Sequence, residues 1–328
     1  MYISTKNKKD FDLIQTYLKK EKILFKSTAC PSIYIINIIN NDLEPKEIDY
    51  FKKELNIEFI SIENGYLTSK NYKEKSTINI GDLVIGGNKP IFISGPCCIE
   101  SEDQIISIAK EVKKYGANIL RGGAYKPRTS PYDFQGLEKE GLDLLYKAKQ
   151  VTGLPIISEL MDIKYIDIFL EDVDIIQIGS RNMQNYHLLK EIGKVKKPVM
   201  LKRGLASTIK ELLLCAEYIM ANGNENVMLC ERGIRTFEKY TRNTMDVACI
   251  PLLKELSHLP IIADPSHATG KRSLIKPMTL ASIASGVDGI MIESHNNPDL
   301  ALCDGPQSIY PSELKEIIEK SIKIHSII

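Results

Sequence analysis

The sequence has almost no excess of charge, because 43 lysines and arginines face 42 aspartates and glutamates over 328 residues. A surface that binds nucleic acid or an acidic membrane needs an excess of basic charge, so we expect neither partner. The sequence also lacks an apolar run of about 18 residues and a leader-like pattern near its start. These absences predict a cytoplasmic protein that does not span a membrane.

The cysteines lack the paired spacing of a secreted disulfide framework. Their number is odd and they are scattered along the chain, as Cys30, Cys97, Cys98, Cys215, Cys230, Cys249 and Cys303. We therefore expect reduced thiols, one of which is a possible metal ligand. The adjacent pair in the segment GPCCIES raises the question of whether either cysteine takes part in chemistry.

The length and the pattern of the chain predict two domains that divide near residue 70. Residues 1–62 alternate short apolar strands with amphipathic helices in the order β-α-β-β-α-β, which is the ferredoxin-like unit. A polar linker follows, and residues 78–88, INIGDLVIGGN, then predict a hairpin with GGN at its turn. The predicted domains are residues 1–70 and residues 71–328.

From residue 77 onward, one arrangement of a short apolar strand, a polar loop and a helix occurs eight times. The predicted strands are residues 90–94, 117–121, 154–158, 174–178, 197–201, 226–230, 259–263 and 287–292. Such runs alternating with helices indicate parallel strands covered on both faces, and eight of them close a (β/α)₈ TIM barrel. An open doubly wound sheet is the alternative, but no glycine-rich dinucleotide fingerprint follows the first strand.

A barrel of this kind carries its active site at the C-terminal ends of the strands, where this sequence gathers basic residues. The six candidates are Arg121, Lys126, Arg128, Arg181, Lys202 and Arg232. A single arginine at a strand exit is most often solvated or caps a helix. A ring of uncompensated cations on one rim instead predicts a substrate with one or more phosphates, since arginine binds phosphate and carboxylate oxygens in pairs.

Potential metal ligands follow the first, seventh and eighth predicted strands. They are Cys97, His267, Glu293 and, in the loop beyond the last strand, Asp304. Thiolate, imidazole and carboxylate are ordinary ligands of a divalent transition metal, and closure of a barrel makes these strands neighbours. Each residue alone would more often be structural. Together they predict a metal site, for which His295 and His258 are alternative ligands.

Seven segments of the chain resemble the signature segments of 3-deoxy-D-arabino-heptulosonate 7-phosphate (DAHP) synthases, of the short type related to 3-deoxy-octulosonate 8-phosphate (KDO8P) synthases. They span about residues 77–325 and read GPCCIES, RGGAYKPRTSPYDFQG, QIGSRNMQN, LKRG, LCERGIRTFE, DPSHATGKR and ESHNNPDLALCDGPQS. The resemblance implies a transferase on a (β/α)₈ barrel that condenses phosphoenolpyruvate with erythrose 4-phosphate and water, the first step of the shikimate pathway toward aromatic amino acids.

Two alternative functions stay open beside this resemblance. KDO8P synthases use arabinose 5-phosphate as the aldehyde and carry a K-A-N-R-S-like segment, whereas residues 126–130 here read KPRTS, which favours erythrose 4-phosphate. The other alternative is a barrel without catalytic activity that senses a phosphorylated metabolite or an amino acid. Such a sensor would tolerate the loss of the candidate ligands, yet all of them are present.

The resemblance implies a role for each matching residue. The residues that match phosphoenolpyruvate-binding positions are Arg121, Lys126, Arg181, Lys202 and Arg232. Those on the erythrose 4-phosphate side are Arg128 and Thr129, with Asp264 as a weaker candidate whose alternative role is to cap a turn. The implied metal ligands are Cys97, His267, Glu293 and Asp304, a set that accepts Mn²⁺, Fe²⁺, Co²⁺ or Zn²⁺.

Three of these residues are candidates for catalysis, namely Lys126, His267 and Cys97. Neighbouring cations are expected to lower the pKa of Lys126 and make it a proton donor, and its alternative role is to anchor a phosphate. His267 either binds the metal or acts as an acid. Side chains alternate along an extended segment, so Cys97 and Cys98 are not both expected to face the barrel mouth. The G-P-C pattern of the family implies that Cys97 faces it, near Cys303, with Cys98 packed behind the strand.

The predicted ferredoxin-like domain carries no cluster of metal or phosphate ligands. Related synthases with such an extension use it for feedback inhibition by tyrosine or phenylalanine, often as tetramers. The resemblance therefore implies an allosteric homotetramer in which tyrosine or phenylalanine binds between N-terminal domains. The alternative is a domain that only stabilises or oligomerises the protein.

Overall fold

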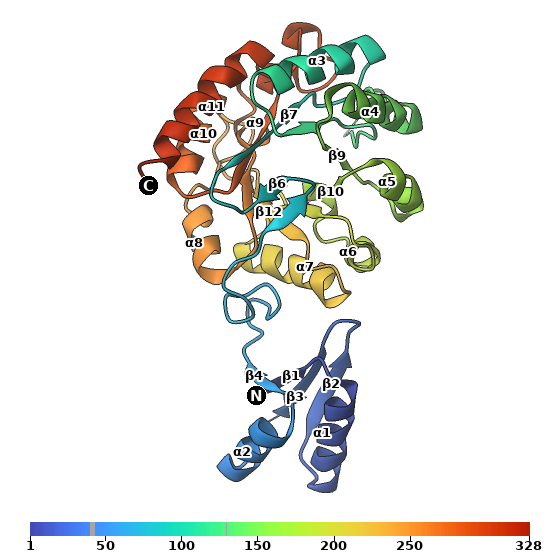
Figure 1. Ribbon diagram of the computed structural model, residues 1–328, viewed down its shortest axis with the longest axis vertical. Helices are drawn as coiled ribbons and strands as arrows, with labels where there is room; N and C mark the ends of the chain where they lie inside the picture. The colour runs from blue at the N-terminus through green and yellow to red at the C-terminus, as the bar shows by residue number, and fades with distance from the viewer. Residues whose placement is uncertain (40–42, 129) are drawn as a thin grey trace.

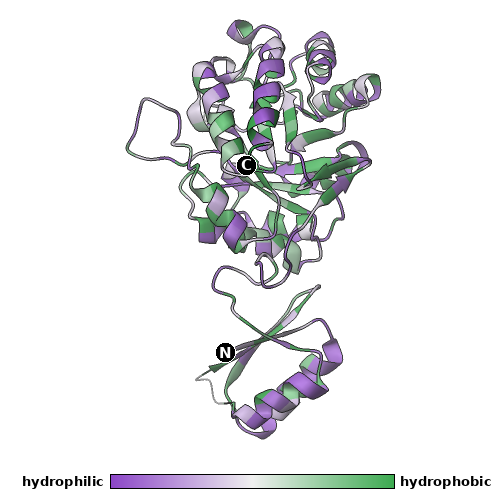
Figure 2. Ribbon diagram, turned by 60° about the vertical axis from the view of Figure 1, so that its left-hand side comes forward, coloured by the Kyte–Doolittle hydropathy of each residue, from purple (hydrophilic) through white to green (hydrophobic). Residues whose placement is uncertain are grey.

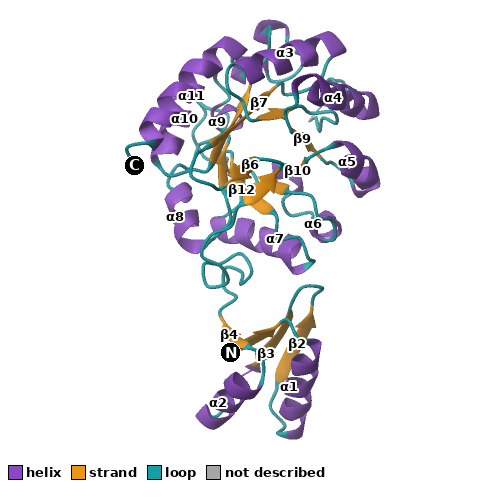
Figure 3. Cartoon of the chain, viewed as in Figure 1, coloured by secondary structure: helices purple, strands orange, loops and turns teal. Residues whose placement is uncertain are grey.

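Residues 1–39, 43–128 and 130–328 are described by the computed structural model, which places a small α+β unit at the N-terminus beside a large barrel (Figure 1). Eight parallel strands close the barrel, and helices surround it (Figure 3). The predicted fold class, a TIM barrel preceded by a ferredoxin-like unit, is therefore confirmed.

The N-terminal unit is a four-stranded antiparallel sheet with two helices. Its elements are β1 (Tyr2–Thr5), α1 (Lys8–Lys20), β2 (Phe25–Ala29), β3 (Tyr34–Ile38), α2 (Pro45–Glu54) and β4 (Glu58–Ile60). The strand order β2-β3-β1-β4 is that of the ferredoxin-like fold. Phe11, Ile14 and Leu18 recur at helical spacing on α1 and pack in one buried cluster with Ile3 and Ile36 of the sheet.

A hairpin of β5 (Ile78–Ile80) and β6 (Leu83–Ile85) leads into the barrel. Its turn is Gly81–Asp82, because Ile80 pairs with Leu83 and Gly81 has a φ of +56°, so the prediction of GGN as the turn is wrong. The GGN segment follows β6 instead. Ile78 and Ile85 belong to the buried cluster that fills the barrel interior, and the hairpin covers the barrel end opposite the strand exits (Figure 1).

All eight predicted barrel strands are present, and each begins one or two residues later than predicted. They are β7 (Ile91–Gly95), β8 (Ile119–Arg121), β9 (Ile156–Glu159), β10 (Ile175–Ile178), β11 (Val199–Lys202), β12 (Val227–Glu231), β13 (Ile261–Ala263) and β14 (Gly289–Glu293). Neighbouring strands are parallel, and β14 pairs with β7 to close the barrel. The sequence pattern therefore located every strand that carries a candidate site residue.

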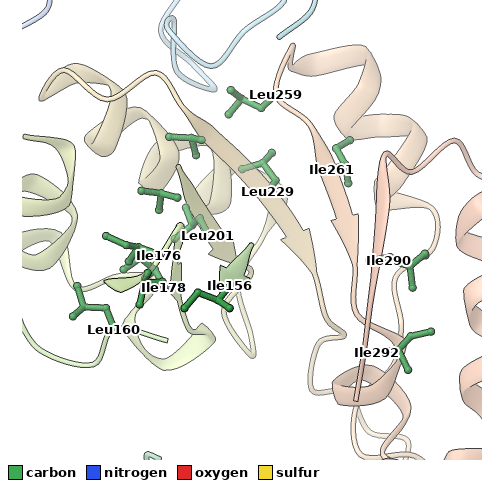
Figure 4. Close-up of a cluster of buried hydrophobic side chains, with 14 of the residues drawn as sticks. Ile156, Leu160, Ile176, Ile178, Leu201, Leu229, Leu259, Ile261, Ile290 and Ile292 are labelled. Atoms are coloured by element: carbon green, nitrogen blue, oxygen red, sulfur yellow. The ribbon is translucent and has the colours of Figure 1, made fainter. Parts of the chain in front are cut away.

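The helices bury one face each against the outside of the strands. They are α3 (Glu102–Lys114), α4 (Glu138–Thr152), α5 (Ile166–Asp172), α6 (Tyr186–Gly193), α7 (Ile209–Ala221), α8 (Cys249–Leu256), α9 (Pro265–Thr269), α10 (Arg272–Ala284) and α11 (Pro311–His325). Ile176, Leu201 and Leu229 are among the outward-facing strand residues of this core (Figure 4). Apolar residues accordingly gather between strands and helices, and polar residues cover the outside (Figure 2).

The N-terminal unit contacts the barrel at α7 (Figure 1). Ser32 Oγ donates hydrogen bonds to the main-chain oxygens of Met220 and Ala221, at 2.9 Å each. The linker follows the same helix, where the N–H groups of Leu67 and Thr68 donate to the Glu217 carboxylate at 3.0 Å. Within the described residues, no helix is long and apolar enough to cross a membrane.

Gly95, at the end of β7, provides a test of how tightly the first strand exit is packed. A Cβ atom at Gly95 would lie 2.1 Å from the main-chain oxygen of Arg121. We expect Gly95→Ala to lower the free energy of unfolding by more than about 3 kcal/mol in urea titrations. The control, Gly286→Ala, has a φ of +86° but no neighbour within 4 Å, and should cost only about 1 kcal/mol. Equal losses in the two variants would contradict this packing.

Candidate functional site

A cavity of about 230 Å³ opens at the C-terminal ends of the barrel strands. All six basic residues that the sequence singled out line it: Arg121, Lys126, Arg128, Arg181, Lys202 and Arg232. Two further arginines, Arg235 and Arg242, line the same cavity. Arg242 was missed, because it lies in a long loop after β12 and nothing in its spacing distinguishes it from a surface residue. Thr129 lies outside the described residues.

Three of the six cations are already paired with carboxylates, so the expectation of an uncompensated ring is wrong for Arg121, Lys202 and Arg128, whose partner Asp133 is partly exposed. Arg121 Nη1 lies 2.9 Å from Glu293 Oε1, and Lys202 Nζ lies 2.6 Å from Asp264 Oδ2. Both pairs are buried. Burial requires such compensation, because an isolated charge would otherwise lose its hydration without replacement.

Arg232 has a different environment. Its Nη1 is buried and has no hydrogen-bond partner among the described residues. Burial lowers the pKa of Arg232, which still remains a cation at neutral pH. A buried guanidinium donor on the wall of a cavity fits an anionic ligand, which would supply the missing acceptor.

Asp264 lies behind this wall, and it is not among the residues that line the cavity. It is the N-cap of α9, where its Oδ1 accepts a hydrogen bond from His267 N at 3.0 Å. Its Oδ2 lies 2.6 Å from Lys202 Nζ and 2.7 Å from His267 Nδ1. Burial raises the pKa of Asp264, but the charges of His267 and Lys202 outweigh burial and hold that pKa well below its usual range. This placement favours the capping role over contact with an aldehyde.

Four potential metal ligands meet beside the cavity. One donor atom from each of Cys97, His267, Glu293 and Asp304 lies within 4.8 Å of all the others. The Sγ of Cys97 lies 3.3 Å from Asp304 Oδ2, and His267 Nε2 lies 3.3 Å from Glu293 Oε1. The strand exits of β7, β13 and β14 supply these side chains, as the sequence predicted.

The two alternative histidines lie elsewhere. His295 Nε2 is 3.4 Å from Glu100 Oε2, and His295 is not part of the cluster of four. His258 precedes β13 at the opposite end of the barrel, where its Nε2 contacts the main-chain oxygen of Leu67 at 2.7 Å. His267 is therefore the histidine that the fold brings to the other three candidate ligands.

The donor set fits a divalent transition metal. Glu293 Oε1 is fully buried and lacks a hydrogen-bond partner in the described part of the chain, since the nearby Arg121 nitrogen is not aligned with it. A buried carboxylate oxygen that lacks an aligned hydrogen-bond donor and lies beside an imidazole, a thiol and a second carboxylate is suited to bind a cation. Contact with Cys303 and burial raise the pKa of the Cys97 thiol well above its usual range. A bound cation would displace that proton and stabilise the thiolate.

The two adjacent cysteines differ in their contacts. Cys97 Sγ belongs to the cluster of four, whereas Cys98 Sγ donates to Glu100 Oε1 at 3.5 Å. Both cysteines and Cys303 form one small buried cluster, so the predicted proximity of Cys303 to Cys97 is confirmed. Of the adjacent pair, Cys97 is the cysteine whose sulfur meets the other potential ligands.

Lys126 reaches the cluster from the loop after β8. This loop pairs with the loop after β7 through a bridge between Cys98 and Gly123. As a result, Lys126 Nζ lies 3.1 Å from Cys97 Sγ and 3.2 Å from Cys97 O. Burial lowers the pKa of Lys126, but the charges of Cys97 and Glu159 outweigh both burial and Arg121, so the pKa is raised. The expectation of a lowered pKa is wrong, because the acids around this ammonium group outweigh the cations.

Comparison with known proteins identifies a family for most of the chain. The profile of the DAHP synthetase I family matches residues 62–328. The phospho-2-dehydro-3-deoxyheptonate aldolase of Thermotoga maritima is 46% identical over 253 residues, which are 77% of this chain and 75% of that protein. The 2-dehydro-3-deoxyphosphooctonate aldolase of Geobacter sulfurreducens is 30% identical over 270 residues, which are 76% of this chain and 98% of that protein.

Solved structures extend the likeness to the N-terminal unit. The crystal structure of the Thermotoga maritima DAHP synthase superposes with a TM-score of 0.80 and 36% identity, covering 99% of this chain and 98% of that one. A truncated form of the Thermotoga maritima enzyme has a TM-score of 0.74 and 41% identity, and covers 80% of this chain and 96% of that one. Identity is lower where the N-terminal residues are included.

The buried pair of Lys202 and Asp264 is expected to stabilise the fold strongly as a unit. Lys202→Met or Asp264→Asn alone leaves one buried partner uncompensated and should cost about 3 kcal/mol in urea unfolding. The loss of unfolding free energy in the double variant should be smaller than the sum of the two single losses, by at least about 1 kcal/mol.

The exposed pair of Lys276 and Glu316, 3.1 Å apart, serves as the control. Its coupling in the same cycle should be below about 1 kcal/mol, because water screens it. A buried coupling no larger than this exposed one would show that Lys202 and Asp264 do not act as a pair.

Proposed function

The chain belongs to the DAHP synthetase I family, and we propose that it condenses phosphoenolpyruvate with erythrose 4-phosphate and water to give DAHP and phosphate. The observation that supports this best is the buried, unpaired Arg232 donor in a basic cavity that adjoins the four potential metal ligands. One site then combines binding of anions with activation of a carbonyl group.

Phosphoenolpyruvate carries a phosphate and a carboxylate on one small carbon frame. We assign it to the basic residues at the exits of β8, β10, β11 and β12, namely Arg121, Lys126, Arg181, Lys202 and Arg232. Arginine pairs bidentately with both kinds of group, so this wall fixes the substrate in position and orientation.

Erythrose 4-phosphate is assigned to the loop that follows β8. Arg128 Nη2 lies 3.2 Å from Asp133, a pair that is partly exposed and that a phosphate can displace. Thr129 is the proposed second phosphate contact. Two anionic substrates repel each other in solution, and separate cationic subsites convert that encounter into an oriented one.

Cys97, His267, Glu293 and Asp304 would hold the divalent metal, proposed as Mn²⁺, Fe²⁺, Co²⁺ or Zn²⁺. When bound, such an ion acts as a Lewis acid toward the aldehyde oxygen. Asp264 accepts a hydrogen bond from the main-chain N–H of His267 and lies 2.7 Å from its Nδ1, a placement that supports an imidazole with Nε2 toward the cluster.

In the proposed reaction, the enol carbon of phosphoenolpyruvate attacks the aldehyde carbon. Water adds at the cationic centre that results, and phosphate leaves by cleavage of its C–O bond. The Lys126 ammonium group, beside Cys97, is the proposed proton donor to the aldehyde oxygen. Its raised pKa keeps it protonated and also suits an anion anchor, which is its alternative role.

KDO8P synthase activity is the second candidate function. Octonate aldolases are among the relatives, but at 28–31% identity against 46% for the heptonate aldolase. The segment KPRTS supports the four-carbon aldehyde, because it provides Arg128 and Thr129 where a K-A-N-R-S-like sequence would not. A sensor without catalytic activity is less favoured, since both the anion-binding and the metal-binding residues are complete.

The N-terminal domain, residues 1–70, is proposed to mediate feedback inhibition by tyrosine or phenylalanine within a homotetramer. The matched family segment begins at residue 62, so the sheet and helices of this unit lie outside it. This unit has its own buried core, which suits a domain that moves as a body.

All seven cysteines are free, which supports the cytoplasm as the proposed location.

The reaction is tested by offering the purified chain phosphoenolpyruvate with either aldehyde and identifying the product by mass spectrometry. We expect DAHP and released phosphate with erythrose 4-phosphate, and at least about 10-fold lower turnover with arabinose 5-phosphate. Treatment with a chelator should abolish turnover, and Mn²⁺ should restore it in the wild type but not in Cys97→Ala. Preference for arabinose 5-phosphate would favour KDO8P synthase, and full activity after chelation would refute the metal role.

The regulatory role is tested with a chain that lacks residues 1–61 and keeps the linker contacts to Glu217. The full chain should lose activity as tyrosine or phenylalanine is added, whereas the shortened chain should be active and unaffected. Unchanged inhibition in the shortened chain would exclude the N-terminal domain as the regulatory site. A full chain that responds to neither amino acid would leave the domain with a stabilising or oligomerising role.

A further inference from the structure

We propose that Gln307 is a positioning residue which, together with Arg242, binds the outer oxygens of both carboxylate ligands, so that each carboxylate presents a single oxygen to the metal. The inference rests on the metal site proposed above. Neither residue belongs to the four candidate ligands, and neither was singled out in the sequence.

The contact to Glu293 is the shortest that Gln307 makes. Gln307 Nε2 donates to Glu293 Oε2 at 2.6 Å. The other oxygen, Oε1, lies 3.3 Å from His267 Nε2 and forms a buried ion pair with Arg121 Nη1 at 2.9 Å, but it accepts no aligned hydrogen bond among the described residues. One oxygen is therefore held by the amide, and the other faces the cluster.

The two carboxylate oxygens of Asp304 also have different partners. Its Oδ1 lies 3.3 Å from Arg242 Nη1, whereas its Oδ2 lies 3.3 Å from Cys97 Sγ and 4.0 Å from His267 Nε2. A longer contact of 3.4 Å joins Gln307 Nε2 to Oδ2. Arg242 thus holds Oδ1 of Asp304 by an ion pair, and Gln307 holds Oε2 of Glu293 by a hydrogen bond.

Arg242 and Gln307 also fix each other. Arg242 Nη1 donates to Gln307 Oε1 at 2.7 Å, so the amide oxygen faces the guanidinium and the amide nitrogen faces the carboxylates. Gln307 is only 3% exposed, and its main-chain N–H donates to the main-chain oxygen of Asp304 at 3.1 Å. The amide therefore has no freedom to turn away.

This arrangement has a consequence for the metal. A carboxylate with one oxygen held by a donor binds through the other, which limits the chain to one sulfur, one nitrogen and two oxygens as donors. Outer contacts of this kind typically contribute about 10-fold to 100-fold to metal affinity, because they keep the ligand in its binding orientation. Without the Gln307 amide, Glu293 Oε2 loses its hydrogen-bond donor and becomes a second oxygen that the carboxylate can offer to the metal.

The test uses Co²⁺ as the probe, with the full-length protein stripped of metal. Its dissociation constant is measured by competition with a chelator, and its visible absorption bands report the coordination. We expect Gln307→Met to raise the dissociation constant by about 10-fold to 100-fold and to change the bands. Arg242→Met should weaken binding as well, and the double variant should bind no more weakly than the product of the two single effects.

Gln177→Met is the matched control. Gln177 is also buried, and its Nε2 donates to a carboxylate of the same cavity, Glu159 Oε2, at 3.2 Å, but neither residue is part of the cluster of four. It should keep the wild-type Co²⁺ affinity and bands. This control separates the loss of a contact to a metal ligand from the general loss of a buried amide.

The outcomes distinguish the inference from the metal site itself. If the wild type binds Co²⁺ no more tightly than Cys97→Ala, the proposed metal site fails, and the inference fails with it. If the wild type binds Co²⁺ tightly and both Gln307→Met and Arg242→Met match it in affinity and bands, only the positioning role is overturned. Should Gln307→Met not fold, Arg242→Met, whose side chain is 38% exposed, decides the question.

Discussion

The pairing of β14 with β7 is the contact on which the candidate site depends. Five residue pairs join these strands, from Gly289 beside Ile91 to Glu293 beside Gly95. This register places Glu293 next to the exit that carries Cys97, although the two are far apart in sequence. Ser94 of β7 and Ser294, the residue that follows β14, also share a buried hydrogen bond of 2.7 Å. Without this closure, Cys97 would lie at one edge of an open sheet, and His267, Glu293 and Asp304 would lie at or near the other edge.

Charge compensation then decides which basic groups of the cavity are best suited to bind an anion. Arg121 and Lys202 are each paired with a buried carboxylate. The pairing holds both side chains in place and partly neutralises their positive charge. Arg232 has neither an ion-pair partner nor a hydrogen-bond partner for its buried Nη1 among the described residues, so an anion would satisfy it best. The carboxylates that compensate these cations are Glu293, a proposed metal ligand, and Asp264, which contacts the proposed ligand His267. The proposed anion and metal sites are consequently parts of one electrostatic network.

The sequence was sufficient to predict the barrel, the ferredoxin-like unit and the four potential ligands, because apolar periodicity fixes the strands and strand exits meet at one end. It did not predict the hairpin turn, since GDL and GGN both contain turn residues and only the pairing of Ile80 with Leu83 selects between them. The sequence also carried no signal for Arg242 and Gln307, and it predicted a lowered pKa for Lys126 where the structure raises it. These features depend on distances between loops, which local pattern does not encode.

The central claim is that barrel closure builds a metal centre inside an anion-binding cavity. Anomalous diffraction from crystals of the full chain soaked in Mn²⁺ would test it most directly. The account predicts one strong peak within about 2.6 Å of Cys97 Sγ, His267 Nε2, Glu293 Oε1 and Asp304 Oδ2. A peak at another position, or no peak among these four atoms at saturating Mn²⁺, would contradict it.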